Sequence, residues 1–240
     1  VVAYQDNRTA SSTTGSPCWN VFLSRFRFDA QPMYQDVWAT PDAIQSGVCE
    51  NQTSLQLRTS GKEITRPFPM AVVCWQDERE DPNNGITDIW AQTIDVAGTT
   101  FAAAPVGIKI CDETGPQERP VMTLWERPEI PGVQTYLPIA IIAWEDSRDV
   151  NQEDVYALQF DVFAAQELAP CSVNGDVAGA APAVKTELSI DHVPDAVTNP
   201  EATTAYIAWR QEGGTTIDVW YQAVTVPNWD QKYPQTGFAV

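Results

Sequence analysis

The sequence AVVCWQDEREDPNNGITDIWAQTID, from Ala71 to Asp95, decides the fold of this chain. Successive side chains of a β-strand point to opposite faces, and the segment Ala71–Arg79 alternates with this period of two. One predicted face carries four residues: Val73, Trp75, Asp77 and Arg79. The segment Asp88–Asp95 is rich in β-branched and aromatic residues, which predicts a second strand. Because Pro82 and the pair Asn84-Gly85 favour a turn between the two, the stretch predicts a β-hairpin.

The first strand of this hairpin recurs along the chain. Related segments are VVAYQDNR at residues 1–8, IIAWEDSR at 141–148 and YIAWRQEG at 206–213. Each copy has an aromatic anchor at the same place, and successive anchors are 71, 69 and 65 positions apart: Tyr4, Trp75, Trp144 and Trp209. Three cysteines recur out of phase with spacings of 62 and 60: Cys49, Cys111 and Cys171. Landmarks that share one period indicate a repeat protein.

Each complete repeat reads as four strands: an opening run, the aromatic strand, its hairpin partner and an outer strand. Eighteen Pro and thirteen Gly, without a long apolar pattern of period 3.6, favour many short strands over helices. Tandem four-stranded antiparallel units are typical of β-propeller blades. We therefore expect an all-β fold, a β-propeller of about four such blades in one domain spanning residues 1–240. The expected repeat units are approximately 1–52, 53–112, 113–172 and 173–240.

The number of blades in the complete ring stays open. The first repeat unit lacks an opening strand before Val1, and no further Pro-initiated run follows Val240 to supply it. We expect the chain to be a segment of a larger propeller, slightly ahead of two alternatives. In one, a closed four-bladed ring uses the C-terminal tail as its clasp. In the other, a neighbouring molecule supplies the missing strand.

The repeated motifs resemble those of a known family. The series V-V-x-W-x-D-x-R at 72–79, D-I-x-A-Q-x-x-D-x-x-G at 88–98, G-I-x-I-C at 107–111 and Q-x-x-P at 117–120 resembles the repeats of large secreted bacterial propeller proteins. It is also similar, more distantly, to sialidase-type propellers, because the segment 93–101 loosely matches their Asp-box. The resemblance implies a propeller fold and a secreted, extracellular or cell-surface location. It implies little about activity, because one propeller scaffold hosts many functions.

Charge and cysteine content limit the partners. The formal net charge of −18 repels phosphate backbones and argues against nucleic acid as a partner. No apolar run reaches the roughly 18 residues of a membrane span. Five cysteines leave at least one unpaired, a Cys18–Cys49 disulfide is feasible, and Cys74 is expected to be a small buried apolar residue. The single histidine, His192, is expected in a loop at 189–194, and without a second histidine or a Cys-x-x-Cys motif the sequence argues against zinc and haem sites.

Aspartate and arginine two residues apart follow three of the aromatic anchors. The pairs are Asp6 with Arg8, Asp77 with Arg79, and Asp146 with Arg148. In one interpretation, borrowed from sialidases, arginines from separate blades converge on a substrate carboxylate. In the favoured interpretation each arginine pairs with its own aspartate and ties off the hairpin end, because residues repeated in every blade are normally structural. The fourth repeat has Gln211 and Gly213 at these positions.

The hairpin turns also offer oxygen ligands for a metal. The loop 81–88 resembles the calcium loops of integrin-like propellers, and a shorter version follows at 149–154. The candidate calcium ligands are Asp81, Asn83, Asp88, Asp149, Asn151 and Asp154. The alternative is that these Asp and Asn side chains form Asx-turns, which explain their presence in hairpins without a metal.

These observations favour a non-catalytic protein, secreted or displayed on a cell surface. We expect it to act as a structural scaffold that contacts proteins or glycans, with further copies of itself among the partners. One alternative is a sialidase-like glycoside hydrolase. Another is a subunit of a repeating extracellular assembly in which a strand is donated in trans.

Overall fold

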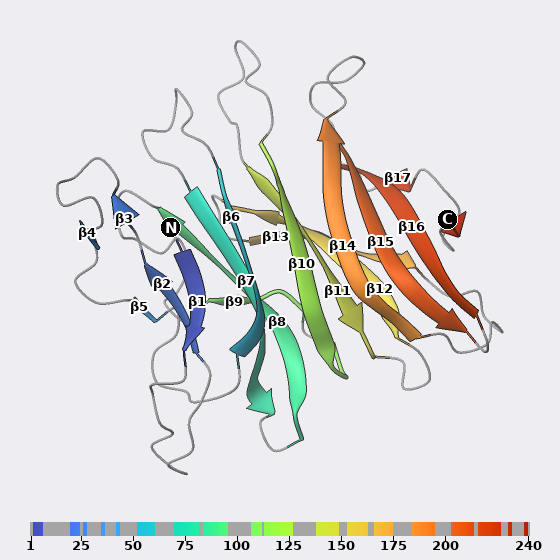
Figure 1. Ribbon diagram of the computed structural model, residues 1–240, viewed down its shortest axis with the longest axis horizontal. Helices are drawn as coiled ribbons and strands as arrows, with labels where there is room; N and C mark the ends of the chain where they lie inside the picture. Colours follow the sequence, from blue (N-terminus) through green and yellow to red (C-terminus); the bar gives the residue numbers. More distant parts are fainter. Residues whose placement is uncertain are drawn as a thin grey trace. The chain divides into compact units, whose positions relative to one another are not determined.

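All elements that the structure describes are β-strands (Figure 1). The computed structural model describes residues 2–6, 20–24, 26–27, 35–36, 42–43, 52–60, 70–81, 84–95, 107–111, 113–126, 138–148, 153–162, 166–174, 184–194, 203–213, 216–226, 230–231 and 238–239. The chain forms two compact units, Val1–Asp112 and Glu113–Val240. The prediction of an all-β chain is confirmed for the described residues, whereas the expected single domain stays a prediction.

The described residues of the N-terminal unit form three antiparallel sheets. The first sheet has the strand order β1-β2-β5, and β3 and β4 form a separate pair. The second sheet, β6-β7-β8-β9, follows the order of the sequence. The strands are β1 (Val2–Asp6), β2 (Asn20–Ser24), β3 (Phe26–Arg27), β4 (Gln35–Asp36), β5 (Asp42–Ala43), β6 (Gln52–Thr59), β7 (Met70–Asp81), β8 (Ile86–Asp95) and β9 (Ile108–Lys109).

In the C-terminal unit, the described strands form two antiparallel sheets. The third sheet, β10-β11-β12-β13, again follows the order of the sequence. The fourth sheet runs β14-β15-β16-β17, and β18 also pairs with β16. The strands are β10 (Gln117–Trp125), β11 (Ile139–Asp146), β12 (Asp154–Asp161), β13 (Gln166–Asn174), β14 (Val184–Pro194), β15 (Thr203–Gly213), β16 (Thr216–Val226), β17 (Asp230–Gln231) and β18 (Phe238–Ala239).

The second, third and fourth sheets share one strand plan and one register. In each, the repeat tryptophan pairs with an aromatic residue of the next strand: Trp75 with Trp90, Trp144 with Tyr156, and Trp209 with Trp220. The predicted hairpin at 71–95 is present as β7 and β8, and its turn contains Asn84 and Gly85. The sequence period therefore corresponds to a structural period in these three sheets.

A β-bulge recurs in the opening strand of each of these sheets. The register shifts after Thr53 in β6, after Glu118 in β10 and after Thr186 in β14. The residue that follows each shift has a positive φ of 51° to 55°, and these residues are Ser54, Arg119 and Glu187. A non-glycine residue in this left-handed region costs about 1 kcal/mol or more, so three recurrences indicate a feature that the surrounding ladder maintains.

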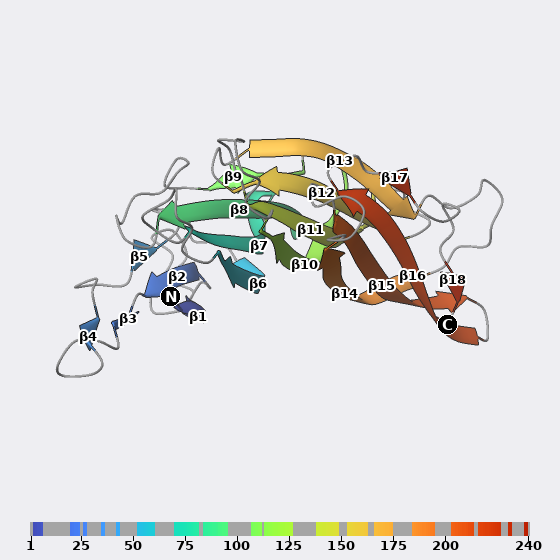
Figure 2. The same ribbon diagram turned by 90° about the horizontal axis from the view of Figure 1, so that it is seen from above.

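Apolar sheet faces form the cores of both units. In the N-terminal unit, Val21 of the first sheet belongs to one buried cluster with Val73 and Trp75 of the second sheet. In the C-terminal unit, Ile141 of the third sheet belongs to one cluster with Ile207 and Trp209 of the fourth sheet. Figure 2 shows the third and fourth sheets as neighbouring layers. Within each unit, the repeat tryptophan of one sheet is thus buried against the sheet that precedes it.

The expected loop around His192 is wrong, because this residue lies within β14. It pairs in register with Ala205 of β15, and its Nδ1 lies 2.9 Å from the hydroxyl of Thr123 in β10. The local sequence Asp191–Pro194 carries turn-forming residues, but nine of the eleven residues of β14 pair in register with β15, and this pairing decides the conformation. No helix in the described part of the chain has the length and apolar character that a transmembrane helix requires.

Gly107 offers a test of how closely the sheet packs on its tryptophan. A Cβ at Gly107 would lie 2.7 Å from Cη2 of Trp75, whereas a Cβ at Gly85 would have no atom within 4 Å. Both glycines have positive φ, +82° and +66°, so alanine is strained at both positions. We expect Gly85→Ala to lower the free energy of unfolding by about 1 kcal/mol and Gly107→Ala to lower it by about 3 kcal/mol, since overpacking adds to the strain. Urea unfolding of both variants measures the difference, and equal losses would contradict the packing of Trp75.

Candidate functional site

The polar cluster around Asp77 is built on the end of β7. Its buried carboxylate accepts hydrogen bonds from Trp75 Nε1 at 2.8 Å and from Gln52 Nε2 at 2.9 Å, both on Oδ2. The backbone N–H of Arg79 donates to Oδ1 at 3.0 Å, and the Arg79 guanidinium forms an ion pair with the same carboxylate. Alternation along the strand brings Trp75, Asp77 and Arg79 to one face. The buried charge is therefore compensated by three neighbours and by the backbone.

The guanidinium of Arg79 is held on its other side by an aromatic ring. Its Cζ lies 3.7 Å from the ring centroid of Trp90, which faces Trp75 across the ladder. An arginine stacked on a ring in a desolvated place gains roughly 2 kcal/mol from the ring quadrupole. Arg79 is thus fixed between a carboxylate and an indole, and its side chain is almost fully buried.

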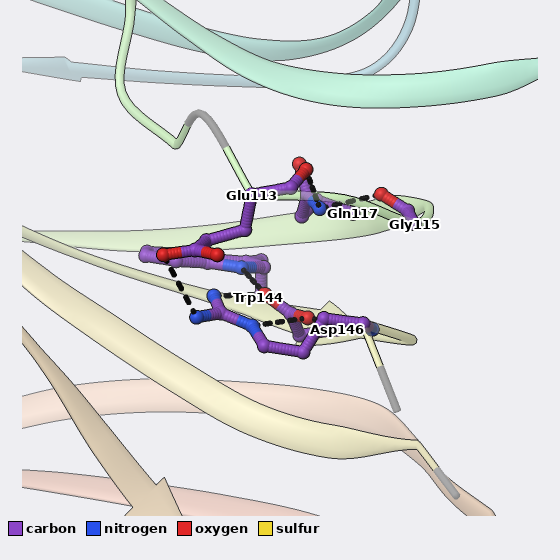
Figure 3. A network of polar contacts seen from close by, with 6 residues as sticks. Glu113, Gly115, Gln117, Trp144 and Asp146 are labelled. Carbon is purple, nitrogen blue, oxygen red and sulfur yellow. Dashed lines mark hydrogen bonds and ion pairs between the residues drawn. The ribbon is translucent and has the colours of Figure 1, made fainter. Parts of the chain in front are cut away.

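The third sheet repeats this arrangement around Asp146 (Figure 3). Trp144 Nε1 donates to Asp146 Oδ2 at 2.9 Å. Arg148 binds the carboxylate in a bidentate manner, with Nε 2.8 Å from Oδ1 and Nη2 2.6 Å from Oδ2, and its backbone N–H also donates to Oδ1. The Arg148 guanidinium lies 3.8 Å above the ring centroid of Tyr156. The same tryptophan, aspartate, arginine and aromatic ring therefore form a cluster twice, once in each unit.

The glutamine that opens each of these sheets differs in its contacts. Gln52 joins the first and second sheets, because its Oε1 accepts from the backbone N–H of Val21 at 2.7 Å and its carbonyl oxygen accepts from Gln5 Nε2 at 2.6 Å. Gln117 donates instead to the carbonyl oxygens of Glu113 at 3.2 Å and Gly115 at 2.5 Å (Figure 3). Equivalent positions thus stabilise a contact between sheets in one case and a preceding turn in the other.

The cluster is altered in the fourth sheet, and in the first sheet its side chains lie outside the described residues. In the fourth sheet Trp209 Nε1 donates to Gln211 Oε1 at 3.3 Å, and Gly213 replaces the arginine. This hydrogen bond to a neutral side chain is longer than those from Trp75 and Trp144 to their aspartates, and Gly213 cannot form the ion pair of Arg79 and Arg148. In the first sheet Tyr4 and Asp6 belong to β1, but their side chains and the whole of Arg8 lie outside the described residues.

The expected calcium ligands are only partly described. Asp88 is buried, and its Oδ2 lies 3.2 Å from Nζ of Lys109, which also contacts Glu80 at 2.6 Å. Asp154 is buried in β12 and pairs in register with Asp146. The side chain of Asp81 and the residues Asn83, Asp149 and Asn151 lie outside the described residues. A calcium ion ligated by Asp88 would compete with the Lys109 ammonium, and the calcium site stays a prediction.

No group of three or more His, Cys, Asp or Glu side chains among the described residues is placed to hold a metal ion. The expected Cys18–Cys49 disulfide falls outside the part of the chain that is described. Cys74 and Cys111 are both buried, so Cys74 is the buried residue that the sequence predicts. Burial raises the pKa of the Cys74 thiol, which disfavours the reactive thiolate.

An ion pair that sequence reasoning missed lies next to the Asp146 cluster. Glu145 is buried on the opposite face of β11, and the bulge residue Arg119 contacts its carboxylate. In the fourth sheet the two positions carry the opposite charges, with Glu187 Oε1 3.0 Å from Arg210 Nη1. Because the charges are reversed between the two sheets, no common sequence motif indicates this ion pair. In both sheets the bulge brings the two partners together.

Burial raises the pKa of the Glu145 carboxyl group. Desolvation raises its pKa to about 7 from an ordinary value of 4.5, although the Arg119 guanidinium lowers it, and the nearby carboxylates Glu153 and Glu118 add to the increase. A carboxyl group that is harder to ionise in the folded state than in the unfolded state favours folding while it is protonated. Its contribution is complete below pH 4.5 and disappears as the pH rises towards 7.

Comparison of the chain with protein-family models, with curated proteins and with solved structures gives no match. What the chain does is therefore inferred from the contacts of its own residues. The polar clusters at Asp77 and Asp146 are the most developed of these contacts.

The pH dependence of stability tests the environment of Glu145. We expect the free energy of unfolding to fall as the pH rises from about 4.5 to about 7, and Glu145→Gln to remove this slope because the amide does not titrate. Arg119→Met should move the transition to higher pH, since the guanidinium is the group that favours the ionised form. Urea unfolding at a series of pH values measures both effects. A slope that survives in Glu145→Gln would assign the titration to another group.

Proposed function

We propose that this chain is a non-catalytic scaffold of stacked antiparallel sheets, either a β-propeller or a segment of one, that is secreted or displayed on a cell surface. The observation that carries the proposal is the state of Arg79 and Arg148. Each guanidinium is bound to the aspartate two residues earlier and stacked on a ring of the neighbouring strand. These side chains stabilise the sheet ends and have little capacity left for a ligand.

The sialidase-like alternative makes a different demand on the same residues. A site that binds a substrate carboxylate needs guanidinium groups whose N–H donors are available to it. Arg148 uses Nε and Nη2 on Asp146, and its Nη1 lies 3.6 Å from Glu113 Oε1. Arg79 is almost fully buried against Asp77 and Trp90. The contacts therefore favour the structural role.

The shared plan of the sheets supports the propeller. The second and third sheets are four-stranded, follow the sequence order and have the same register between their tryptophan strand and its partner. Where two sheets pack within one unit, the tryptophan-bearing face of the later sheet meets the earlier one. Repetition of one such contact around an axis is how propeller blades close.

The acidic composition and the resemblance to secreted repeats favour protein or glycan partners outside the cell. A formal charge of −18 keeps such a protein soluble and attracts cations, which is also consistent with calcium at the hairpin turns. Calcium binding and the glycan contact remain part of the proposal rather than of the observed geometry.

Substitution of Arg79 separates the structural role from the catalytic one. If the scaffold proposal holds, Arg79→Ala lowers the melting temperature by several degrees, because it leaves Asp77 charged and buried. The wild-type protein should release no product from a panel of sialosides and aryl glycosides above the buffer blank. Asp191→Asn, at a highly exposed side chain, is the matched control and should leave the melting temperature unchanged. Turnover that Arg79→Ala abolishes without loss of thermal stability would favour the hydrolase.

A further inference from the structure

The fourth sheet exposes apolar side chains on one face. Four large apolar residues are exposed among the residues described, and all of them belong to this sheet: Val193 in β14, Tyr206 in β15, and Ile217 and Val219 in β16. Their exposed fractions are 58%, 38%, 61% and 50%. A concentration of exposed apolar residues on one element indicates an interaction surface more than scattered single residues do.

The register places these residues on the face that points away from the third sheet. Ala205, Ile207 and Trp209 alternate with Tyr206 along β15, and they are buried in the cluster shared with the third sheet. Val219 pairs with Arg210, which, like Tyr206, lies on the face of β15 opposite to that of Trp209. The strands β14, β15 and β16 lie side by side in Figure 1 and form one continuous surface. We call this surface, defined by Val193, Tyr206, Ile217 and Val219, the open face.

The third sheet shows what covers the corresponding face one repeat earlier. Counted from the repeat tryptophans and the shared register, Tyr206 corresponds to Ile141, Val219 to Val155 and Val193 to Trp125. All three counterparts are at most 1% exposed. They are buried in a cluster with Ala205, Ile207 and Trp209. The face is thus built to receive the tryptophan-bearing face of another sheet of this repeat.

We propose that the open face docks the first sheet of a second copy of this chain, in a head-to-tail contact. In the first sheet, Ala3 and Val21 pack in the cluster of the second sheet, and the strand positions that alternate with them include Tyr4. Tyr4 corresponds in the sequence to Trp209, and Val2 corresponds to Ile207. The first sheet therefore supplies the repeat position that covers Ile141 and Val155 in the third sheet. The inference rests on the proposed scaffold function and extends it to an assembly.

Charge determines the conditions under which the contact forms. Arg210 on the open face is paired with Glu187 and Glu212, and the Asp191 side chain is 91% exposed, so no excess positive charge is described there. Two copies of formal charge −18 repel each other at long range. Because salt screens this repulsion and leaves apolar burial intact, association should strengthen with ionic strength.

Sedimentation equilibrium of the full chain tests the contact directly. Over about 1 to 300 µM we expect a reversible rise in average mass, larger in high salt than in low salt. Val219→Glu should weaken association at least about tenfold, as a charge in the centre of an apolar contact does, while the melting temperature stays unchanged because Val219 is exposed. The matched control is Thr59→Glu, which adds the same charge at an exposed position of β6 outside the open face and should leave the association unchanged.

A mixing experiment establishes the head-to-tail geometry. Tyr4→Glu alters the first sheet and Val219→Glu alters the open face, so each variant alone should lose self-association. A mixture keeps one intact pair of faces and should form a one-to-one dimer that does not grow further. Circular dichroism and thermal unfolding of Tyr4→Glu verify that it is folded, and Val2→Glu replaces it if it is not.

Three results would overturn the proposal. The first is a wild-type monomer at all concentrations and salt conditions. The second is association that Val219→Glu leaves intact, which would place the contact elsewhere. The third is a monomer whose melting temperature falls in Val219→Glu, which would mean that the chain covers this face itself. Glycoside turnover would contradict the scaffold function without changing the mass, so the two proposals fail by different measurements.

Discussion

A buried aspartate at the end of the tryptophan strand is the constraint on which the second and third sheets depend. A carboxylate without water is tolerated only where donors surround it. Asp77 and Asp146 each receive the indole N–H of the repeat tryptophan, a backbone N–H and an arginine. The arginine is then fixed by an aromatic ring of the next strand. One charged group thereby sets the position of a tryptophan, a hairpin end and its partner strand.

The same tryptophan links each sheet to its neighbour within a unit. Trp75 and Trp209 lie in clusters that join two sheets, so the polar end of the strand and the apolar contact between sheets share one side chain. A sheet with two apolar faces is stable only when both are covered. The fourth sheet covers one face of the third sheet in this way. Among the described residues, the open face of the fourth sheet has no such cover and stays exposed. Structure, packing and the inferred assembly follow from one repeated contact.

Sequence reasoning was reliable where the pattern is local and repeated. The hairpin at 71–95 and the pairing of Arg79 with Asp77 follow from alternation with period two and from a motif that recurs at Trp144. It missed the bulges at Ser54, Arg119 and Glu187, because serine, arginine and glutamate share no preference for positive φ. The Arg119–Glu145 pair depends on that bulge, and its reversed copy has no common sequence. The loop predicted around His192 from local turn chemistry is wrong, because long-range strand pairing overrides that chemistry. The ring of blades, the calcium ligands and the disulfide remain predictions.

A double-mutant cycle on Asp146 and Arg148 tests the central claim most directly, since the fourth sheet already carries the neutral combination Gln211 and Gly213. Urea unfolding gives the free energies of the wild type, Asp146→Gln, Arg148→Ala and the double variant. If the two side chains stabilise the sheet as a pair, the double variant loses less than the sum of the single losses, with a coupling energy of about 2 kcal/mol. A coupling energy below about 0.5 kcal/mol would show that Arg148 acts independently of Asp146, and the structural account of the repeated arginines would be wrong.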